Sequence, residues 1–272
     1  MSAAAGNGRR GSLIAVGTGI RTVGQLTVES IAWIRDADKV LYVVGDPIGE
    51  AMVNELNPEG AESLATLYGE GKPRIKTYEE MVERILACVR GGAVTCTACY
   101  GHPGVFVYPS HEAIRRARAE GYEARMLPGI SAEDCLFADL GVDPGMHGCQ
   151  SYEATDFLAN NRRIDPTSSV ILWQIGVVGD ATFKAAGYDL SAFPLLVERL
   201  LTLYPPSHTV YLYEAAIAPG AEPTIVPVTI GLLGHAPKSA GQTLYIPPAY
   251  APTPDPAVYA RMQQLAVSGA AA

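Results

Sequence analysis

The chain lacks the features that mark nucleic-acid-binding and membrane-spanning proteins. Lys and Arg number 20 against 28 Asp and Glu in 272 residues, and the net charge of −8 argues against a nucleic-acid partner. No apolar run reaches the roughly 18 residues that a membrane-spanning helix needs, so no membrane association is expected. Residues 1–11 are small, basic and polar, with no apolar signal core behind them. We therefore expect a disordered N-terminal lead and a cytoplasmic protein.

Cysteine and histidine are also scarce. Cys96 and Cys99 have a C-x-x-C spacing, but they lie in an apolar strand pattern without a second pair. Buried small hydrophobic side chains are the simpler interpretation, and an odd total of five cysteines requires no disulfide. The five histidines have no metal-ligand spacing, so no metal site is predicted.

One stretch organises the rest of the chain. A small-residue strand over Ala93–Cys99 ends in the Gly/Pro-rich loop Tyr100–Phe106, and a helix over 109–120 leads to a strand over Glu123–Met126. A second such loop, Leu127–Glu133, follows. The two loops leave the carboxyl ends of neighbouring strands, which is the edge where open α/β sheets bind ligands.

The part before this stretch has the same alternating pattern. Strands are predicted over 12–16 and 39–44, and helices are predicted to begin at the capping residues Thr27 and Asp46, although Asp46 could instead contact a ribose. The pair Gly17 and Gly19 suggests a dinucleotide-binding turn, but the third glycine of that motif is absent. A doubly wound α/β domain with parallel strands is predicted, without a dehydrogenase function.

A polar segment from 57 to 76 interrupts the periodicity. It holds Tyr68 and Arg74, and Thr77 is predicted to cap a helix whose first residue is Tyr78. Loops tend to carry function, so these side chains are candidate functional residues. The alternative is a solvated loop with aromatic anchors.

The second half of the chain has shorter connections and a mixed pattern. Strands are predicted over 169–175, 209–213 and 243–246, and helices over 193–204 and 229–233. This pattern indicates a second α/β domain with a partly antiparallel sheet. The expected organisation is a lead (1–11), an N-terminal domain (12–127), a C-terminal domain (128–248) and a proline-rich tail with a possible terminal helix (249–272).

These motifs resemble a known superfamily. The strand with Gly17-Thr-Gly19, the loop Tyr100-Gly-His-Pro-Gly104 and the turn Pro128-Gly-Ile-Ser-Ala132 are similar to the tetrapyrrole methylases. Segments 125–139 and 71–78 further resemble its borosin branch of peptide backbone α-N-methyltransferases, known from omphalotin maturation. The resemblance implies a homodimer of two-domain α/β chains, with S-adenosylmethionine in the cleft between the domains.

The same resemblance implies iterative α-N-methylation of backbone amides in a ribosomal precursor peptide. Fused members continue into a clasp region and their own substrate peptide, whereas this sequence stops shortly after Pro248. The split arrangement is therefore expected, with the precursor as a separate chain. Ala65 also stands where fused members often carry a further tyrosine.

The chemistry assigns roles to particular residues. An amide nitrogen is a poor nucleophile because its lone pair is delocalised, so a fixed cation at the carbonyl oxygen and a proton acceptor are needed. Arg74 is the candidate cation and Tyr78 the candidate base, with a phenol pKa lowered by the arginine, while Tyr68 positions the peptide or assists the transfer. By resemblance, the cofactor-binding residues are Tyr100, His102, Val105, Phe106, Ser131, Ala132, Gln174 and Ala215.

Four alternatives remain open. His102 could be a structural loop histidine satisfied by backbone, and Ser131 could simply cap a helix. The whole protein could be a porphyrinoid methyltransferase, although Arg74 and Tyr78 favour amide methylation. It could also be a non-catalytic regulator that binds S-adenosylmethionine or peptide without turnover.

Overall fold

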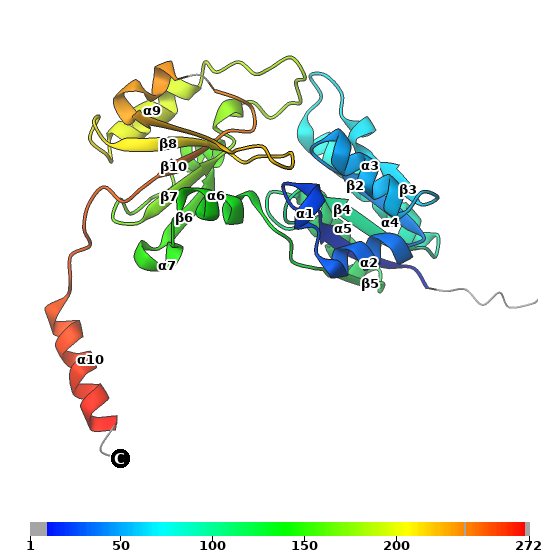
Figure 1. The fold of residues 1–272 in the computed structure, drawn as a ribbon, viewed down its shortest axis with the longest axis horizontal. Coiled ribbons are helices and arrows are strands. Elements are labelled where there is room, and N and C mark those ends of the chain that lie inside the picture. Colours follow the sequence, from blue (N-terminus) through cyan, green and yellow to red (C-terminus); the bar gives the residue numbers. More distant parts are fainter. Residues whose placement is uncertain (1–9, 237, 270–272) are drawn as a thin grey trace, which may run out of the picture.

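The computed structural model describes residues 10–236 and 238–269 and consists of two lobes, each built around one sheet (Figure 1). The first sheet is entirely parallel, as predicted, with the order β3-β2-β4-β1-β5. This order differs from the 3-2-1-4-5 arrangement of dinucleotide-binding domains. Its strands are β1 (Ser12–Gly17), β2 (Lys39–Val43), β3 (Ala61–Ser63), β4 (Val94–Cys99) and β5 (Glu123–Met126).

Helices cover both faces of this sheet. The short α1 (Thr22–Gln25), α2 (Val28–Asp36) and α3 (Pro47–Leu56) follow β1 and β2, and buried residues of α2 and α3 pack on one face. The other face is covered by α4 (Arg74–Arg90) and α5 (Tyr108–Ala119). The predicted caps of α2 and α3 are confirmed: Thr27 accepts a hydrogen bond from the Ser30 amide (3.0 Å), and Asp46 accepts one from the Gly49 amide (2.9 Å).

The second sheet is mixed, which confirms the partly antiparallel sheet predicted for the second half of the chain. Its order is β6-β7-β10-β8-β9, and β6 and β7 form its parallel pair. The sequence pattern missed two of its strands, β6 and β9. The strands are β6 (Cys149–Glu153), β7 (Ser169–Trp173), β8 (Thr209–Glu214), β9 (Thr224–Thr229) and β10 (Thr243–Ile246).

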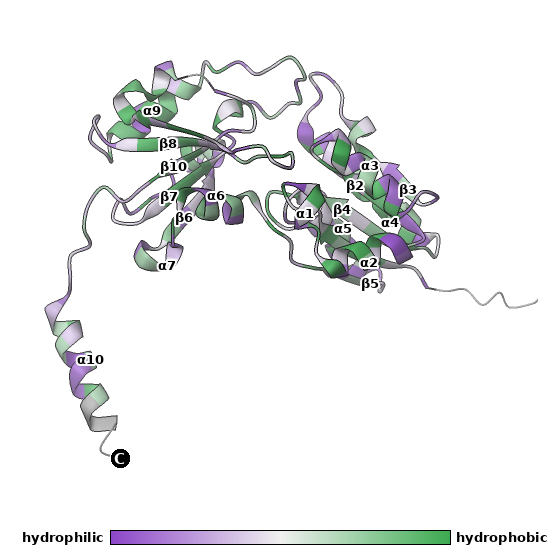
Figure 2. Cartoon of the chain, in the orientation of Figure 1, coloured by the Kyte–Doolittle hydropathy of each residue, from purple (hydrophilic) through white to green (hydrophobic). Residues whose placement is uncertain are grey.

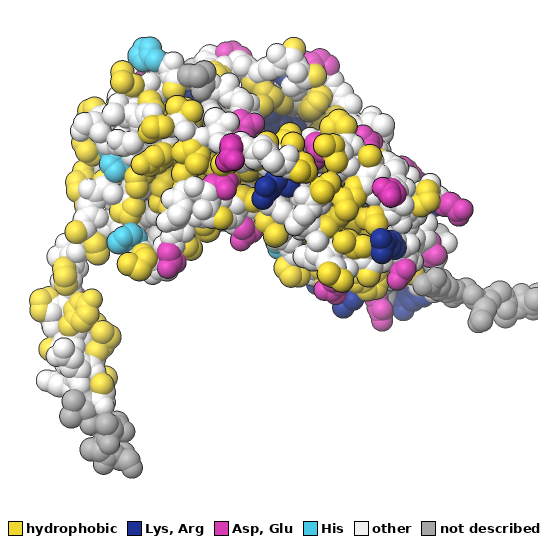
Figure 3. Space-filling view, in the orientation of Figure 1, with side chains coloured by type: hydrophobic (Ala, Val, Ile, Leu, Met, Phe, Trp, Pro, Cys, Tyr) yellow, Lys and Arg dark blue, Asp and Glu magenta, His cyan; other side chains and the backbone are white. Residues whose placement is uncertain are grey.

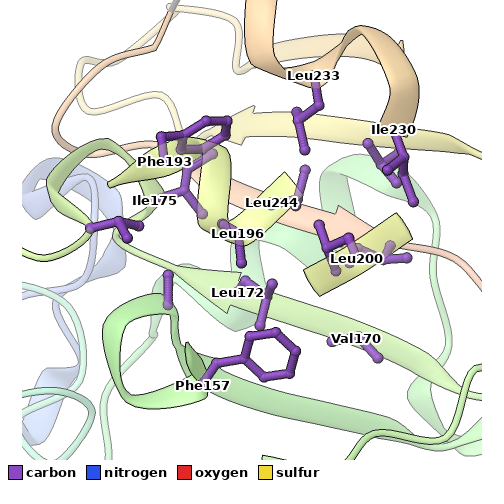
Figure 4. Close-up of a cluster of buried hydrophobic side chains, with 14 of the residues drawn as sticks. Phe157, Val170, Leu172, Ile175, Phe193, Leu196, Leu200, Ile230, Leu233 and Leu244 are labelled. Atoms are coloured by element: carbon purple, nitrogen blue, oxygen red, sulfur yellow. The ribbon is translucent and has the colours of Figure 1, made fainter. Parts of the chain in front are cut away.

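A large apolar cluster lies on one face of this sheet (Figure 4). Phe157 and Leu196 come from the covering helices and pack against Leu172 and Leu244 of the strands. The helices on this face are α8 (Ala154–Ala159), α9 (Phe193–Leu201) and the 3-10 helix η3 (Ile230–His235). On the opposite face lies α6 (Ala132–Leu140), followed by the short α7 (Pro144–His147).

The start of α4 differs from the prediction. Thr77 does not cap this helix: the helix begins at Arg74, and Thr77 is a buried residue within it. The Arg74 amide donates to the carbonyl of Ala181 (2.9 Å), so a distant segment satisfies the backbone where a capping side chain was expected. The segment predicted to be irregular also contains β3 and the 3-10 helix η1 (Leu64–Leu67).

The predicted terminal helix is present as α10 (Pro256–Gly269), and it stands away from both lobes (Figure 1). Hydrophilic and hydrophobic residues alternate along its described part (Figure 2), and the large apolar side chains of Val258, Tyr259, Met262 and Leu265 are exposed (Figure 3). Among the described residues, no helix combines the length and apolar character needed to span a membrane. Most of the lead expected to be disordered, residues 1–9, lies outside the described residues.

Candidate functional site

Three glycine-bearing loops meet at the carboxyl edge of the first sheet. Gly19 and Gly101 pair through two backbone hydrogen bonds (3.2 and 2.9 Å), and Gly101 has a φ of +70°. A Cβ on Gly17 would lie 2.2 Å from the Gly101 carbonyl oxygen, and one on Gly129 would lie 3.1 Å from the Gly17 Cα. These contacts leave room only for glycine, so the loops after β1, β4 and β5 form one close-packed cradle.

A cavity of about 270 Å³ lies at this edge, between the two sheets. It brings together nine of the residues predicted from the sequence: Tyr68, Tyr78, Tyr100, His102, Val105, Phe106, Ser131, Ala132 and Gln174. Other lining residues were not predicted from the sequence, among them Ile20, Met81, Ile85 and Trp173. Trp173 ends β7 directly before Gln174, so its place at a strand end was the signal that could have identified it.

Tyr68 is held in an aromatic cluster. Its ring lies 4.9 Å from that of Phe183 and 6.5 Å, edge to face, from that of Tyr78, measured between centroids. Burial raises the pKa of the Tyr68 phenol well above its usual value; Tyr78 raises this pKa further, and the opposing effect of Arg74 is weaker. Tyr68 is therefore protonated at neutral pH, which suits a hydrogen-bond donor that positions a ligand better than a proton acceptor.

Tyr100 lies close to negative groups. Burial raises the pKa of its phenol to about 12, and the charges of Cys135, Asp46 and Glu214 add to the effect. The phenol is neutral at pH 7, and the nearby carboxylates make this part of the site favourable for a cation.

His102 makes the structural contact that was one of its two interpretations. Its Nδ1 accepts a hydrogen bond from the Gly104 amide (2.9 Å), so the neutral imidazole carries its proton on Nε2. His111 contacts the Gly104 carbonyl oxygen through Nε2 (2.8 Å). Since His102 also lines the cavity, the backbone contact fixes the tautomer of a side chain that faces the site.

Ser131 caps α6 through a reciprocal capping box. Its amide and its Oγ both donate to Oδ2 of Asp134 (2.7 Å each), and its Oγ accepts from the Asp134 amide (3.2 Å). The capping role is confirmed. The Ser131 amide is therefore engaged within the protein, and only further acceptor capacity of the hydroxyl remains for a ligand.

Two cavity residues have strained backbone. Phe106 and Gln174 have φ values of +56° and +58°, which non-glycine residues adopt rarely. They follow β4 and β7 and come from different lobes, and the Phe106 ring packs on Trp173 with centroids 5.7 Å apart. Strained residues gather at functional sites, where the surrounding structure holds them in place.

A second cavity, of about 480 Å³, shares a wall with the first. Tyr78, Phe106, Val107 and Gln174 line both cavities, whereas Arg74 lines only the second. Ala215 lies apart from the other predicted residues, at a third cavity of about 560 Å³ with Ile130 and Cys135, and its contact with a cofactor stays a prediction.

The cysteine and metal predictions concern the strand that leads into the cavity, which Cys99 also lines, and the chain beyond it. Cys96 and Cys99 are buried and unpaired in β4, and burial raises the pKa of both thiols, that of Cys99 to about 11. Inert buried thiols of this kind match the interpretation from the sequence. The described part of the chain contains no group of three or more His, Cys, Asp and Glu side chains that could hold a metal ion.

The chain is similar to known proteins in sequence and in fold. Residues 12–231 match the family model described as Tetrapyrrole (Corrin/Porphyrin) Methylases. The chain is 49% identical, over 88% of its length, to the methyltransferase/ribosomally synthesized cyclic peptide dendrothelin A precursor of Dendrothele bispora. It is 45% identical, again over 88%, to the corresponding omphalotin A precursor of Omphalotus olearius. The chain spans 58% of the length of each of these two relatives.

Solved structures show the same fold. The uroporphyrin-III-C-methyltransferase of Thermus thermophilus superposes with a TM-score of 0.62, covering 88% of this chain and 93% of that one at 20% identity. The two-lobed α/β architecture agrees with this superposition, and because residues 12–231 match the family model, the chain belongs to the tetrapyrrole methylase family.

Proposed function

We propose that this chain is an S-adenosylmethionine-dependent methyltransferase that adds methyl groups, one after another, to backbone amides of a ribosomal precursor peptide. The observation that carries the proposal is the wall shared by two cavities. Tyr78 lies in that wall, and Arg74 lines the cavity beyond it. The names of the two relatives, which combine a methyltransferase with a cyclic peptide precursor, support the same activity.

The smaller cavity suits the methyl donor. Its glycine cradle allows backbone to approach a ligand closely, its lining is largely apolar, and the carboxylates near Tyr100 favour a positively charged group. Bound there, S-adenosylmethionine would supply an electrophilic methyl group on a sulfonium. Tyr100, His102, Val105, Phe106, Ser131, Ala132 and Gln174 would hold it, and Ala215 stands further away in this structure.

The larger cavity suits the acceptor peptide. The Arg74 guanidinium would donate to the carbonyl oxygen of the target amide and stabilise the negative charge that develops as the amide proton leaves. Tyr78 would accept that proton. The amide nitrogen would then take the methyl group that S-adenosylmethionine supplies, and the electron pair of the S–C bond would stay on sulfur as a neutral thioether. Tyr68, held protonated by burial, would hydrogen-bond the peptide and hold it in place.

The partners follow from the same proposal. An extended peptide would bind the site mainly through its backbone, so the site would recognise backbone amides more than side chains. A homodimer would enclose such a substrate, and the proposed location is cytoplasmic. That the precursor is a separate chain stays a prediction, because the relatives' names describe methyltransferase and precursor together.

A porphyrinoid acceptor is the alternative. The solved structure of that activity is 20% identical and shows the fold alone, whereas the relatives named for peptide precursors are 45–49% identical. The identities therefore favour the peptide acceptor.

The test offers both acceptors to the same protein. The protein is incubated with S-adenosylmethionine and either the precursor peptide encoded with it or uroporphyrinogen, and intact masses are measured over time. We expect one-methyl steps on the peptide and none on the tetrapyrrole, with the steps lost in Arg74→Ala and strongly slowed in Tyr78→Phe. Methylation of the tetrapyrrole alone would refute the proposal. Binding of S-adenosylmethionine without turnover on either acceptor would favour the non-catalytic regulator.

A further inference from the structure

A segment of the second lobe crosses to the loop that carries Arg74. This segment, residues 178–192 between η2 (Ile175–Val177) and α9, is called the strap here and reaches the first lobe in Figure 1. The Gly71 amide donates to the Phe183 carbonyl (2.8 Å), and the Phe183 amide donates to the Lys72 carbonyl (2.9 Å). With the bond from Arg74 to Ala181, these contacts join the two lobes beside the candidate site.

Tyr188 of the strap lies against the Arg74 side chain. The guanidinium carbon is 5.3 Å from the centroid of the Tyr188 ring, a distance typical of a cation–π contact. The Tyr188 hydroxyl accepts a hydrogen bond from the Lys184 amide (3.1 Å), which fixes the ring. An ion pair between Lys184 and Asp180 (2.6 Å) closes the turn between them, and the Ala185 amide donates to Glu70 (2.9 Å).

The kind of contact matters for the chemistry. Within the described residues, Arg84, Arg90 and Arg116 form ion pairs with carboxylates, whereas no carboxylate lies within ion-pair distance of Arg74. A carboxylate would occupy the in-plane N–H donors and cancel the charge. An aromatic ring holds a guanidinium by its face, and it leaves the in-plane donors and the charge available to a carbonyl oxygen.

We infer that Tyr188 is a positioning residue for Arg74, and that the strap supplies it from the second lobe. Tyr188 holds the guanidinium in the orientation that stabilises the peptide oxygen without neutralising it. The inference rests on the proposed function, because it assigns a partner to the cation of that reaction. It makes amide activation depend on a residue more than 100 positions away in the sequence.

The test compares three variants of the full chain. Tyr188→Leu removes the ring, and Tyr188→Phe keeps the ring but loses its hydrogen bond to Lys184. The control is Tyr250→Leu, because Tyr250 is 51% exposed and lines neither of the two cavities that share a wall. The kcat and KM for the precursor peptide and the Kd for S-adenosylmethionine are measured for each. We expect kcat to fall about tenfold in Tyr188→Leu and less than about threefold in Tyr188→Phe, with KM and Kd nearly unchanged.

Two further measurements separate positioning from general structure. In an Arg74→Lys background, Tyr188→Leu should have little further effect on kcat, because the guanidinium that it holds is gone. In protein labelled with ¹⁵N-arginine, the Nε–H resonance of Arg74, identified by its loss in Arg74→Lys, should move in Tyr188→Leu and stay in Tyr188→Phe. The resonance does not depend on turnover.

Several results would overturn the role of Tyr188. Unchanged kcat in Tyr188→Leu, or equal losses of kcat, cofactor affinity and thermal stability in the Leu and Phe variants, would overturn the positioning role. A wild-type protein that methylates no peptide would refute the proposed function and the positioning role together. The arginine resonance would then still report whether the ring contacts the guanidinium.

Discussion

The glycine cradle allows a sharp test at Gly17. Replacing it with alanine places a Cβ 2.2 Å from the Gly101 carbonyl oxygen and 3.0 Å from Cδ of Pro103. A comfortable carbon–oxygen separation is roughly 1 Å longer than the first of these distances. The carbonyl belongs to a loop that is paired with Gly19, so it cannot rotate away freely. The loop after β4 must therefore move as a unit.

The size of the effect follows from these contacts. Overpacking of a close-packed site costs about 1–3 kcal/mol, and a weakened hydrogen bond between Gly19 and Gly101 costs about 1 kcal/mol. Lower entropy of the unfolded chain returns about 0.4–1 kcal/mol. We expect a net destabilisation of about 2–3 kcal/mol and a Tm lower by about 4–10 °C. A shift of about 1 Å in the site would also lower turnover by about 100-fold.

Thermal unfolding measures the loss of stability, the rate of peptide methylation measures the loss of turnover, and titration with S-adenosylmethionine measures cofactor affinity. The matched control is Gly234→Ala in η3, where an added Cβ meets no atom within 4 Å. This control should change stability by less than about 0.5 kcal/mol and leave cofactor affinity intact. If Gly17→Ala melts and binds like wild type, the three loops are not packed as described, and the cradle does not shape the site.

Three other predictions concern single side chains. Because burial raises the pKa of the Tyr100 phenol from 10.0 to about 12, the folded chain holds this proton more tightly than the unfolded chain. The free energy of unfolding should therefore fall as the pH rises from about 10 to about 12. Urea unfolding across this pH range should show a smaller fall in Tyr100→Phe than in wild type. The buried Asn57 side-chain amide donates to two carbonyls (2.8 Å each), and its oxygen accepts from the Gly60 amide (2.8 Å). Asn57→Ala should therefore lower the free energy of unfolding by about 3 kcal/mol in chemical denaturation. A loss below about 1 kcal/mol would contradict this network. Ser131→Ala removes the capping box of α6 and should cost about 1 kcal/mol by thermal unfolding, whereas an unchanged melt would show that Asp134 alone caps the helix.

Local patterns were sufficient for most of the fold. Strands β5 and β10 match their predicted bounds residue for residue, because short apolar or alternating runs between turn residues specify them. Strand β6 was missed because its residues are only half-buried, and β9 because Pro227 interrupts it at the sheet edge.

The sequence predicts which residues line the site better than it predicts how they are arranged. Residues at strand ends gathered in one cavity because parallel strands bring their carboxyl ends together. The positive φ of Phe106 and Gln174 had no local signal, since neither is a glycine or an asparagine. The start of α4 and the partner of Arg74 both depend on the strap, which lies more than 100 residues away in the sequence.

The position of the transferred methyl group tests the central claim most directly. The precursor peptide is synthesised with one target residue already N-methylated, so that its amide has no proton to lose, and both peptides are incubated with the protein and S-adenosylmethionine. Backbone methylation predicts that one methyl group fewer is transferred to the altered peptide, and fragmentation should place every new methyl on a backbone nitrogen. An equal number of methyl groups transferred to both peptides, located on side chains, would contradict the account.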